Sequence, residues 1–242
     1  PHRGVFYPLS KNKCMVYGDI GCYTLGCAAP LNCMDSVVCM GAGFSAGMGI
    51  AKSFEKEGVT GKVVFGVVGD STFFHSGMTG AAEIVYNKGR MIPCVLDNRI
   101  TGMTGHQDNP GTGYTLQGDP TALLSVEKIL TALGFAPVLT VDPQDLKAMK
   151  AAVDQAVAAL DAGQQPAIVT RRPCLLIKRD KFRKGMCRVN ADKCRSCRSC
   201  LKVGCPAISL ENGKAVIDRT QCVGCTVCAQ VCPFDAIEKE EK

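Results

Sequence analysis

The sequence predicts an α/β domain built on a parallel sheet, followed by a small α+β domain. Two apolar runs, 63–68 and 92–96, end in polar residues and are typical of buried parallel strands. A segment with helical spacing lies between them and completes a βαβ unit. Of the 16 cysteines in 242 residues, half crowd between Cys194 and Cys232. The strands predict the sheet, and the crowded cysteines predict a separate metal-binding tail.

The other elements follow in chain order. A short strand from Cys14 leads into a glycine-punctuated turn at 18–23, where a ligand loop is plausible. Small residues recur at helical intervals over 40–51. The gaps between the glycines do not fit the dinucleotide-binding pattern G-x-G-x-x-G, so close packing against a sheet or a second subunit is favoured. Capping and periodicity predict helices over 76–88 and 120–133. They predict a third helix that begins after Asp145 and runs to Ala162. They also predict strands at 138–141 and 167–170, while 101–118 is expected to be a functional loop.

Composition narrows the classes of function. The formal charge is +6, and its excess lies between Arg171 and Lys202 without interleaved aromatic residues, so a solvated linker is favoured over nucleic-acid binding. No apolar run approaches the length of a membrane span, and the first residues lack a secretory pattern. We therefore expect a soluble, cytoplasmic protein. The domains are predicted to be residues 1–184 and residues 185–242.

The tail contains an internal repeat with ferredoxin-type spacing. Cys194-x-x-Cys197-x-x-Cys200 is followed by Cys205-Pro206, and a second run with the same gaps is followed by Cys232-Pro233. In two-cluster ferredoxins the displaced fourth Cys ligates the other cluster. Two [4Fe–4S] clusters are therefore predicted, one on Cys194, Cys197, Cys200 and Cys232, the other on Cys205, Cys222, Cys225 and Cys228.

Zinc is the alternative for these cysteines, but zinc sites rarely use two interlocked triple-Cys runs. Four residues separate Cys200 from Cys205, whereas three separate Cys228 from Cys232, so the first loop is expected to bulge. Short strands are predicted over 207–210 and 236–238. Cys187 lies too far upstream for the pattern and is treated as a non-ligand.

A second site is predicted at the ends of the two apolar strands. Asp70 follows the first strand and Asn98 follows the second. Open α/β sheets bind ligands at the carboxyl ends of their strands. An Asp and an Asn meeting there could share one hard cation, most naturally Mg²⁺ carrying phosphate oxygens. The alternative for Asp70 is a helix cap at the end of a strand.

The motifs around these residues resemble the indolepyruvate:ferredoxin oxidoreductase family. Gly69-Asp70-Ser71, followed after 26 residues by Asn98, is similar to the thiamine diphosphate signature GDG…N, with Ser71 in place of the last Gly. The resemblance extends to the motifs at 1–4, 18–23, 69–77 and 97–107 and continues through the two-cluster tail. It covers the part of that family's large, or alpha, subunit that carries the diphosphate-binding domain and the clusters.

The resemblance implies roles for particular residues. Asp70, Asn98 and the carbonyl of Ile100 would hold Mg²⁺, and Ser71 and Thr72 would donate to the diphosphate. Other residues would line the cofactor pocket or act in catalysis; these are Gly21, Cys22, Gly69, Met103, Thr104, His2, His75 and His106. Two alternatives stay open: Cys22 could be a small buried residue, and His75 and His106 could be proton carriers or hydrogen-bonded loop residues.

The function that the resemblance implies is oxidative decarboxylation of an aryl 2-oxo acid to an acyl-CoA and CO₂. Electrons would pass through the clusters to an external ferredoxin, and coenzyme A would be a co-substrate, although no coenzyme A motif is evident. The Glu that activates the cofactor would come from a pyrimidine-binding domain, and a second, beta- or gamma-type subunit would complete a hetero-oligomer. The alternatives are an enzyme for pyruvate or another aliphatic 2-oxo acid, and an electron-relay subunit with a vestigial thiamine site.

Overall fold

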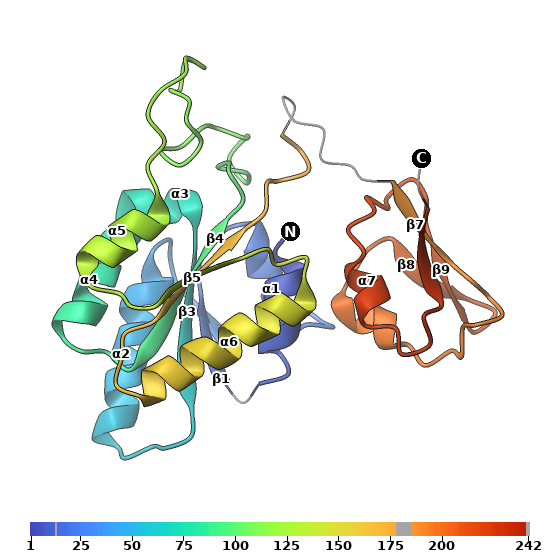
Figure 1. Ribbon diagram of the computed structural model, residues 1–242. Coiled ribbons are helices and arrows are strands. Elements are labelled where there is room, and N and C mark those ends of the chain that lie inside the picture. Colours follow the sequence, from blue (N-terminus) through green and yellow to red (C-terminus); the bar gives the residue numbers. More distant parts are fainter. Residues whose placement is uncertain (13, 178–184, 241–242) are drawn as a thin grey trace.

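The computed structural model describes residues 1–12, 14–177 and 185–240. It shows a larger domain with helices on both faces of a sheet and a smaller domain beside it (Figure 1). The boundary predicted between residues 184 and 185 coincides with the edge of the segment 178–184, which lies outside the described residues.

The larger domain alternates strands and helices. Its strands are β1 (Cys14–Gly18), β2 (Ser36–Val37), β3 (Val63–Gly69), β4 (Met91–Asp97), β5 (Val138–Val141) and β6 (Ala167–Arg171). Its helices are α1 (Arg3–Leu9), α2 (Ala42–Lys56), α3 (Asp70–Thr72), α4 (Met78–Tyr86), α5 (Val126–Leu133) and α6 (Leu146–Asp161), with a 3₁₀ turn η1 (Cys22–Cys27) and a π turn η2 (Phe73–Gly77).

The six strands form one parallel sheet in the order β2-β1-β3-β4-β6-β5. The register pairs Gly69 with Leu96, so β3 and β4 end side by side at the same edge. This confirms the predicted fold class of the larger domain and both strands on which it was based. The polar residues after β3 and β4 are therefore neighbours in space.

Alternate residues of the central strands pack into two cores. Phe65 and Val67 face the core that contains α1 and α6, whereas Val64 and Val68 face the core that contains α2, α4 and α5. Figure 1 shows these helices on opposite faces of the sheet. Because side chains alternate along a strand, a continuous apolar run is what a sheet covered on both faces requires.

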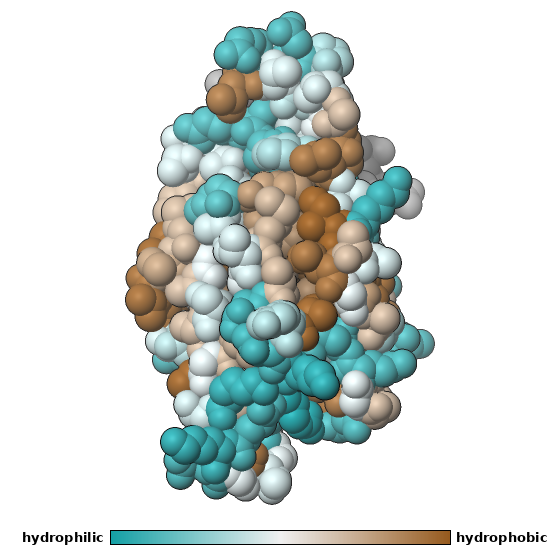
Figure 2. All heavy atoms as spheres, turned by 90° about the vertical axis from the view of Figure 1, so that its left-hand side faces the viewer, coloured by the Kyte–Doolittle hydropathy of each residue, from teal (hydrophilic) through white to brown (hydrophobic). Residues whose placement is uncertain are grey.

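The glycines of α2 allow close packing against the sheet, as predicted. A Cβ on Gly43 would lie 2.1 Å from the Val67 carbonyl oxygen, and one on Gly66 would lie 2.4 Å from the Gly43 carbonyl oxygen. Figure 2 shows the side of the molecule on which α2, α4 and α5 lie, with apolar residues along its middle and hydrophilic residues at its lower end. In the described part of the chain, helices that could cross a membrane are absent.

Two helix predictions need correction, and one helix was missed. The helix predicted over 76–88 begins six residues earlier, because α3, η2 and α4 run on without a break from Asp70. The helix predicted from Pro120 begins at Val126, where the Ser125 hydroxyl accepts a hydrogen bond from the Lys128 amide at 3.2 Å. Helix α1 was not predicted. By contrast α6 begins after Asp145 as predicted, with the Asp145 carboxylate accepting from the Ala148 amide at 2.9 Å.

The smaller domain consists of two antiparallel strand pairs and two short helical turns. The pairs are β7 (Met186–Val189) with β10 (Ile237–Glu240) and β8 (Ile208–Glu211) with β9 (Lys214–Ile217), and the turns are η3 (Ser199–Val203) and α7 (Val227–Gln230). Strands β8 and β10 confirm the two short strands predicted for the tail. The buried core of this domain is unusual, because four of its eight residues are cysteines; its members are Cys187, Cys194, Cys200, Ile208, Ala215, Cys228, Ala236 and Ile237.

Candidate functional site

The sheet edge at the ends of β3 and β4 places Asp70 and Asn98 in the neighbouring positions that the sequence predicted. The Asp70 carboxylate is 3% exposed and accepts a hydrogen bond from the Asn109 amide at 3.2 Å. The Asn98 side-chain oxygen accepts from the Ile100 backbone amide at 3.2 Å. A carboxylate and a side-chain amide therefore lie at the same buried edge of the sheet, and their oxygens are the donor types that Mg²⁺ prefers.

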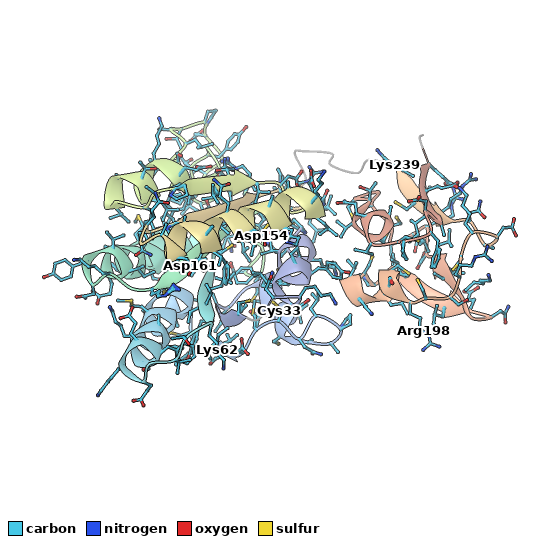
Figure 3. The ribbon with its side chains drawn as sticks, turned by 60° about the horizontal axis from the view of Figure 1, so that its bottom comes forward. Cys33, Lys62, Asp154, Asp161, Arg198 and Lys239 are labelled. Atoms are coloured by element: carbon cyan, nitrogen blue, oxygen red, sulfur yellow. The ribbon has the colours of Figure 1, made fainter. Side chains whose placement is uncertain are left out.

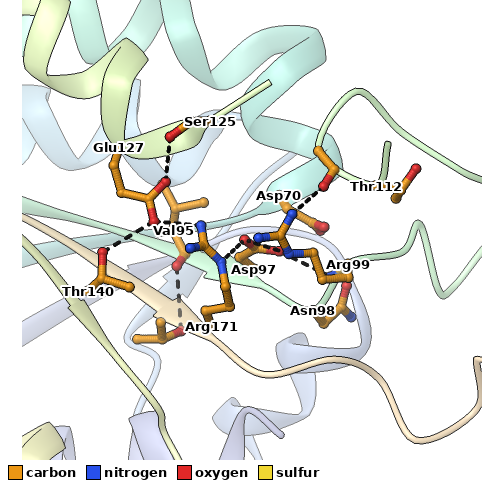
Figure 4. Close-up of polar contacts among 12 residues, drawn as sticks. Asp70, Val95, Asp97, Asn98, Arg99, Thr112, Ser125, Glu127, Thr140 and Arg171 are labelled. Atoms are coloured by element: carbon orange, nitrogen blue, oxygen red, sulfur yellow. Dashed lines mark hydrogen bonds and ion pairs between the residues drawn. The ribbon is translucent and has the colours of Figure 1, made fainter. Parts of the chain in front are cut away.

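A partly buried ion-pair network, centred on the buried Asp97, holds the turn that carries Asn98 (Figure 4). The Asp97 carboxylate receives the Arg171 Nε at 2.7 Å and lies 3.4 Å from the Arg99 Nε. The other end of Arg171 contacts Glu127 at 2.6 Å. Arg99 has φ +61°, which is uncommon for a residue other than glycine, and its guanidinium donates to the Gly111 carbonyl at 2.5 Å. The network was not anticipated from the sequence, because its members are distant along the chain.

The environment of Asp70 favours its protonated form in the absence of a cation. Burial, together with the negative charge of Asp97, raises the pKa of Asp70 to about 7. A divalent cation would bind the carboxylate and displace the proton, so cation binding and proton release are coupled at this site.

A second buried network ties the turn at 18–23 to the start of the Asp70 segment. The Tyr23 hydroxyl donates to the Asp19 carboxylate at 2.7 Å and accepts from the Gly69 amide at 2.8 Å. The other oxygen of the fully buried Asp19 accepts from the Gly41 amide at 2.9 Å. Asp19 and Tyr23 therefore join the ends of β1 and β3 to the start of α2.

The Tyr23 ring explains why two positions of the motifs are glycine. A Cβ on Gly21 would lie 2.4 Å from the ring, and one on Gly69 would lie 2.9 Å from its hydroxyl. Gly69 and Gly21 thus leave room for the tyrosine that positions the Asp70 segment. Asp19 and Tyr23 lie within the motif at 18–23, and the sequence did not predict this network; an acid four residues before a tyrosine is the local pattern that relates the two.

His2 also contacts this site, through Tyr23 and Asn98. Its ring packs edge-on against Tyr23 at 5.4 Å, and its Nε2 lies 3.4 Å from the side-chain nitrogen of Asn98. Burial, and then the positive charges of the chain's amino group and Arg3, lower the pKa of His2 to about 3. The imidazole is therefore neutral at physiological pH and can accept a hydrogen bond from Asn98, which leaves the Asn98 oxygen for a ligand.

The other predicted site residues lie farther out. Cys22 is exposed and close to Gly102, where an added Cβ would be 3.7 Å from its sulfur. His75 is exposed in the π turn. Met103, Thr104 and His106 are exposed in a loop closed by backbone hydrogen bonds between Thr101 and Gln107 at 2.9 and 3.2 Å. The structure shows no contact between these side chains and Asp70 or Asn98 among the described residues, and their roles stay predictions.

The cysteines of the smaller domain divide between two cavities. One cavity is lined by Cys205, Cys222, Cys225 and Cys228, together with Cys187, and the other by Cys194, Cys197, Cys200 and Cys232. These are the two groups that the spacing predicted. Among the described residues, three or more His, Cys, Asp or Glu side chains do not converge closely enough to hold a single metal ion. The amide of Cys187 donates to the Cys222 sulfur at 3.3 Å, so this residue lies beside the second set.

The two triple-Cys runs have the same backbone turns. Ser196 and Gly224 occupy matching positions with φ +57° and +68°, and Arg198 and Thr226 match with φ +60° and +61°. The loop 201–204, which holds the additional residue and was predicted to bulge, ends in Gly204, which has φ +72° at the end of η3. The repeat seen in the sequence is therefore a structural repeat, and glycine accommodates the insertion.

Comparisons with known proteins agree with both sites. Residues 19–170 match the model of the thiamine pyrophosphate enzyme C-terminal TPP binding domain, and residues 215–238 match the 4Fe-4S binding domain. Thiamine pyrophosphate is the cofactor called thiamine diphosphate above. The chain is 39% identical to indolepyruvate oxidoreductase subunit IorA of Pyrococcus abyssi and 40% identical to that of Thermococcus kodakarensis, over 99% and 98% of this chain. It spans about two fifths of each relative, since it covers 39% of both.

A solved structure shares the fold of the larger domain. The 2-oxoglutarate:ferredoxin oxidoreductase of Magnetococcus marinus superposes with a TM-score of 0.53 at 17% identity, over 71% of this chain and 60% of that one. The match to the TPP binding domain extends over more than half of the residues. The chain therefore belongs to the family of thiamine pyrophosphate enzymes, in which residues 19–170 form the C-terminal TPP binding domain.

Proposed function

We propose that this chain supplies the diphosphate-binding half of a thiamine diphosphate site and the clusters of a 2-oxo acid:ferredoxin oxidoreductase. The proposal rests chiefly on one observation: the sheet edge that carries Asp70 and Asn98 and the two cysteine sets belong to one chain. Similarity to IorA subunits supports indolepyruvate or a related aryl 2-oxo acid as substrate. The reaction proposed is oxidative decarboxylation to an acyl-CoA and CO₂, with ferredoxin as electron acceptor.

The proposed Mg²⁺ ligands are the Asp70 carboxylate, the Asn98 side-chain oxygen and the Ile100 carbonyl. Ser71 and Thr72, at the start of the helix that continues through α4, are proposed to donate to the diphosphate. The cofactor, when bound, supplies a carbanion that adds to the carbonyl carbon of a 2-oxo acid. The Asp19–Tyr23 network holds Gly69 and hence Asp70 in position, and the Asp97–Arg171 pair holds the turn that bears Asn98. Both networks are complete within this chain.

Each cysteine set is proposed to hold one [4Fe–4S] cluster, and Cys187 is proposed to be a neighbour without ligating iron. The spread of four thiols around each cavity wall suits a cubane, which takes one thiolate at each iron. Clusters give the electrons released by decarboxylation a path out of the site, which a non-oxidative decarboxylase would not need. The domain division at residues 184 and 185 is part of this proposal.

The complete active site is proposed to need other components. These are a pyrimidine-binding domain that supplies the activating Glu, a beta- or gamma-type subunit, coenzyme A as co-substrate and an external ferredoxin, all in the cytoplasm. Catalytic roles for His2, His75, Met103 and His106 are proposed from family resemblance. Of these four, His2 is the one that contacts the sheet edge in the described structure.

Substrate class is tested by comparing kcat/KM for indolepyruvate, phenylpyruvate and pyruvate in the assembled oxidoreductase that contains this chain. The proposal predicts that both aryl substrates exceed pyruvate by at least about tenfold, since a single favourable apolar contact of a few kcal/mol has that effect. A preference for pyruvate would support the aliphatic alternative. Equal thiamine diphosphate affinity of wild type and Asp70→Ala would instead support an electron-relay subunit with a vestigial thiamine site.

A further inference from the structure

The two cysteine sets are placed differently relative to the larger domain. The cavity lined by Cys205, Cys222, Cys225 and Cys228 is also lined by residues of the larger domain, among them Pro1, Arg3 and Gln144. The cavity lined by Cys194, Cys197, Cys200 and Cys232 is formed by residues of the smaller domain alone. We call these the inner set and the outer set. The two halves of the repeat are therefore not equivalent, because one set lies next to the larger domain and the other does not.

Three hydrogen bonds fix this orientation. The Arg3 Nε donates to the Gly204 carbonyl at 2.8 Å. The Gln230 side chain donates to the Gln144 carbonyl at 2.7 Å and accepts from the Leu146 amide at 2.8 Å. Gly204 ends the loop 201–204, which is one residue longer than the matching loop 229–231. The loop that carries the insertion therefore contacts α1.

The inner set is also linked to the sheet edge by a short path. Pro1 lines the inner cavity, and the next residue, His2, approaches Asn98 within 3.4 Å. On the other side of the turn, the Cys174 amide donates to the Asn98 carbonyl at 2.9 Å, and the following Leu175 lines the inner cavity. Two chain segments thus connect the proposed Mg²⁺ ligand with the wall of the inner cavity.

The outer set is exposed to solvent at Cys197, and basic residues form a rim around it. Cys197 is exposed, and the exposed residues Arg195 and Arg198 flank it and line the same cavity. Neither arginine forms an ion pair with another residue in the described ranges. Figure 3 shows Arg198 at the lower edge of the smaller domain. Phe234, which is 44% exposed, adds an apolar surface to this rim.

The rim keeps an excess of positive charge, although the exposed Asp235 follows Phe234 and places one carboxylate beside the two arginines. Glu238 is already paired with Lys193 at 2.8 Å and Arg188 at 3.2 Å. Unpaired guanidinium groups around an exposed apolar side chain are suited to an acidic protein surface, since complementary charge speeds encounter and fixes orientation.

We propose that electrons enter the smaller domain at the inner set and leave at the outer set, where Arg195, Arg198 and Phe234 dock an acidic one-electron acceptor protein. This inference rests on the proposed function. For each 2-oxo acid the bond to the carboxylate carbon breaks and CO₂ leaves, while a bond forms between the acyl carbon and the coenzyme A sulfur. The thiol proton goes to solvent, and the two electrons released reduce two acceptor molecules by one electron each.

The docking part is tested with Arg195→Gln/Arg198→Gln in the assembled oxidoreductase, and with Lys128→Gln/Lys147→Gln as the matched control. Both pairs remove two positive charges from exposed positions, but Lys128 and Lys147 lie on α5 and α6 of the larger domain. Affinity for a purified acidic ferredoxin is measured by titration calorimetry at low and high salt.

The proposal predicts that the arginine pair raises the Kd about tenfold at low salt and flattens its salt dependence, whereas the control changes it less than about twofold. Equal effects of the two pairs on the Kd would overturn the proposed docking site. Substrate-driven reduction of methyl viologen, a small acceptor, is measured in parallel. Its absence in wild type would overturn the proposed function, whereas its presence with unaltered ferredoxin affinity would overturn this inference alone.

The order of the two sets is tested by low-temperature EPR after rapid mixing with substrate. Cys197→Ser alters the outer set, and we expect substrate still to reduce the inner cluster. Cys225→Ser alters the inner set, and we expect dithionite, but not substrate, to reduce the remaining cluster. The reverse pattern would overturn the order.

If a serine variant fails to hold a cluster, Arg3→Ala provides the second test, because it removes the contact with Gly204 and leaves every cysteine in place. The rate at which substrate reduces the clusters should fall several-fold, while reduction by dithionite should not change. An unchanged rate with substrate would contradict an entry point at the inner set.

Discussion

The sheet edge and the smaller domain hold their functional groups in opposite ways. At the sheet edge, Asp19, Tyr23, Asp97 and Arg171 position the ligand-bearing segments through hydrogen bonds and ion pairs that the protein makes by itself. In the smaller domain, half of the buried core residues are cysteines. The sheet edge is organised by the protein's own polar contacts, whereas the core of the smaller domain is formed in part by proposed cluster ligands. Loss of cofactor should therefore have different consequences in the two regions.

The largest effect is expected from removing iron. Because cysteine thiols form so much of the small core, chelation should unfold residues 186–240 and leave the larger domain intact. Hydrogen exchange would show this as loss of amide protection in β7 to β10, with protection retained in β3 and β4. Protection retained in both regions would contradict the view that the clusters support the smaller domain.

The complementary experiment perturbs the sheet edge instead of the smaller domain, by the substitution Asp70→Ala. We expect thiamine diphosphate affinity in the presence of Mg²⁺ to fall at least about 100-fold, because the charged ligand of the cation is lost. Iron and sulfide content should not change, since the cysteine sets lie in the other domain. The measurement is calorimetric titration of cofactor together with iron analysis, and a parallel loss of iron would contradict independent sites.

A smaller effect is expected from Tyr23→Phe. The change leaves one oxygen of the buried Asp19 carboxylate and the Gly69 amide without the Tyr23 hydroxyl, which costs roughly 1–3 kcal/mol of stability. Cofactor affinity should fall about tenfold because Gly69 precedes Asp70. The control is Tyr86→Phe, since Tyr86 is 83% exposed and should show neither effect. Loss of stability with full cofactor affinity would limit Tyr23 to a structural role.

The smallest effect concerns pH. The pKa of Asp70 is raised from 3.8 to about 7 in the folded chain, so the folded state holds the proton more tightly than the unfolded state. Its contribution to the stability of the cation-free protein is therefore full below pH 4 and is lost as pH rises toward 7.

Mg²⁺ should show the opposite trend, because it binds the carboxylate. Its affinity should rise about threefold between pH 6.5 and pH 7.5, following the ionised fraction of Asp70. Calorimetry with saturating thiamine diphosphate measures this, and Asp70→Asn should remove the slope. A pH-independent affinity in wild type would contradict a raised pKa at this site.

Local sequence signals predicted the parts of the molecule that depend on local chemistry. Apolar runs located β3 and β4, and the Cys spacing anticipated both cysteine groups. Helix α1 was missed because it has only seven residues and contains Pro8, and its stability comes from packing: a Cβ on Gly4 would lie 1.5 Å from the Pro143 carbonyl oxygen. Such contacts between distant segments leave no local pattern.

The error at α5 has a similar cause. Asp119-Pro120 has the composition of a helix start, but the Asp119 carbonyl accepts from the Thr115 amide at 2.9 Å and closes a turn instead. The Asp97–Arg171 pair was missed because 74 positions separate its members. Sequence motifs therefore predicted candidate ligands, which stay predictions, whereas the residues around them became evident only in the fold.

The account's central claim is that electrons released at the sheet edge pass to the cysteine sets of the same chain. The most direct test is EPR of the assembled, anaerobic oxidoreductase after addition of indolepyruvate and coenzyme A, in wild type and in Asp70→Ala. The claim predicts reduced [4Fe–4S] signals in wild type, none with substrate in the variant, and equal signals in both with dithionite. Substrate-driven cluster reduction that survives in Asp70→Ala would contradict it.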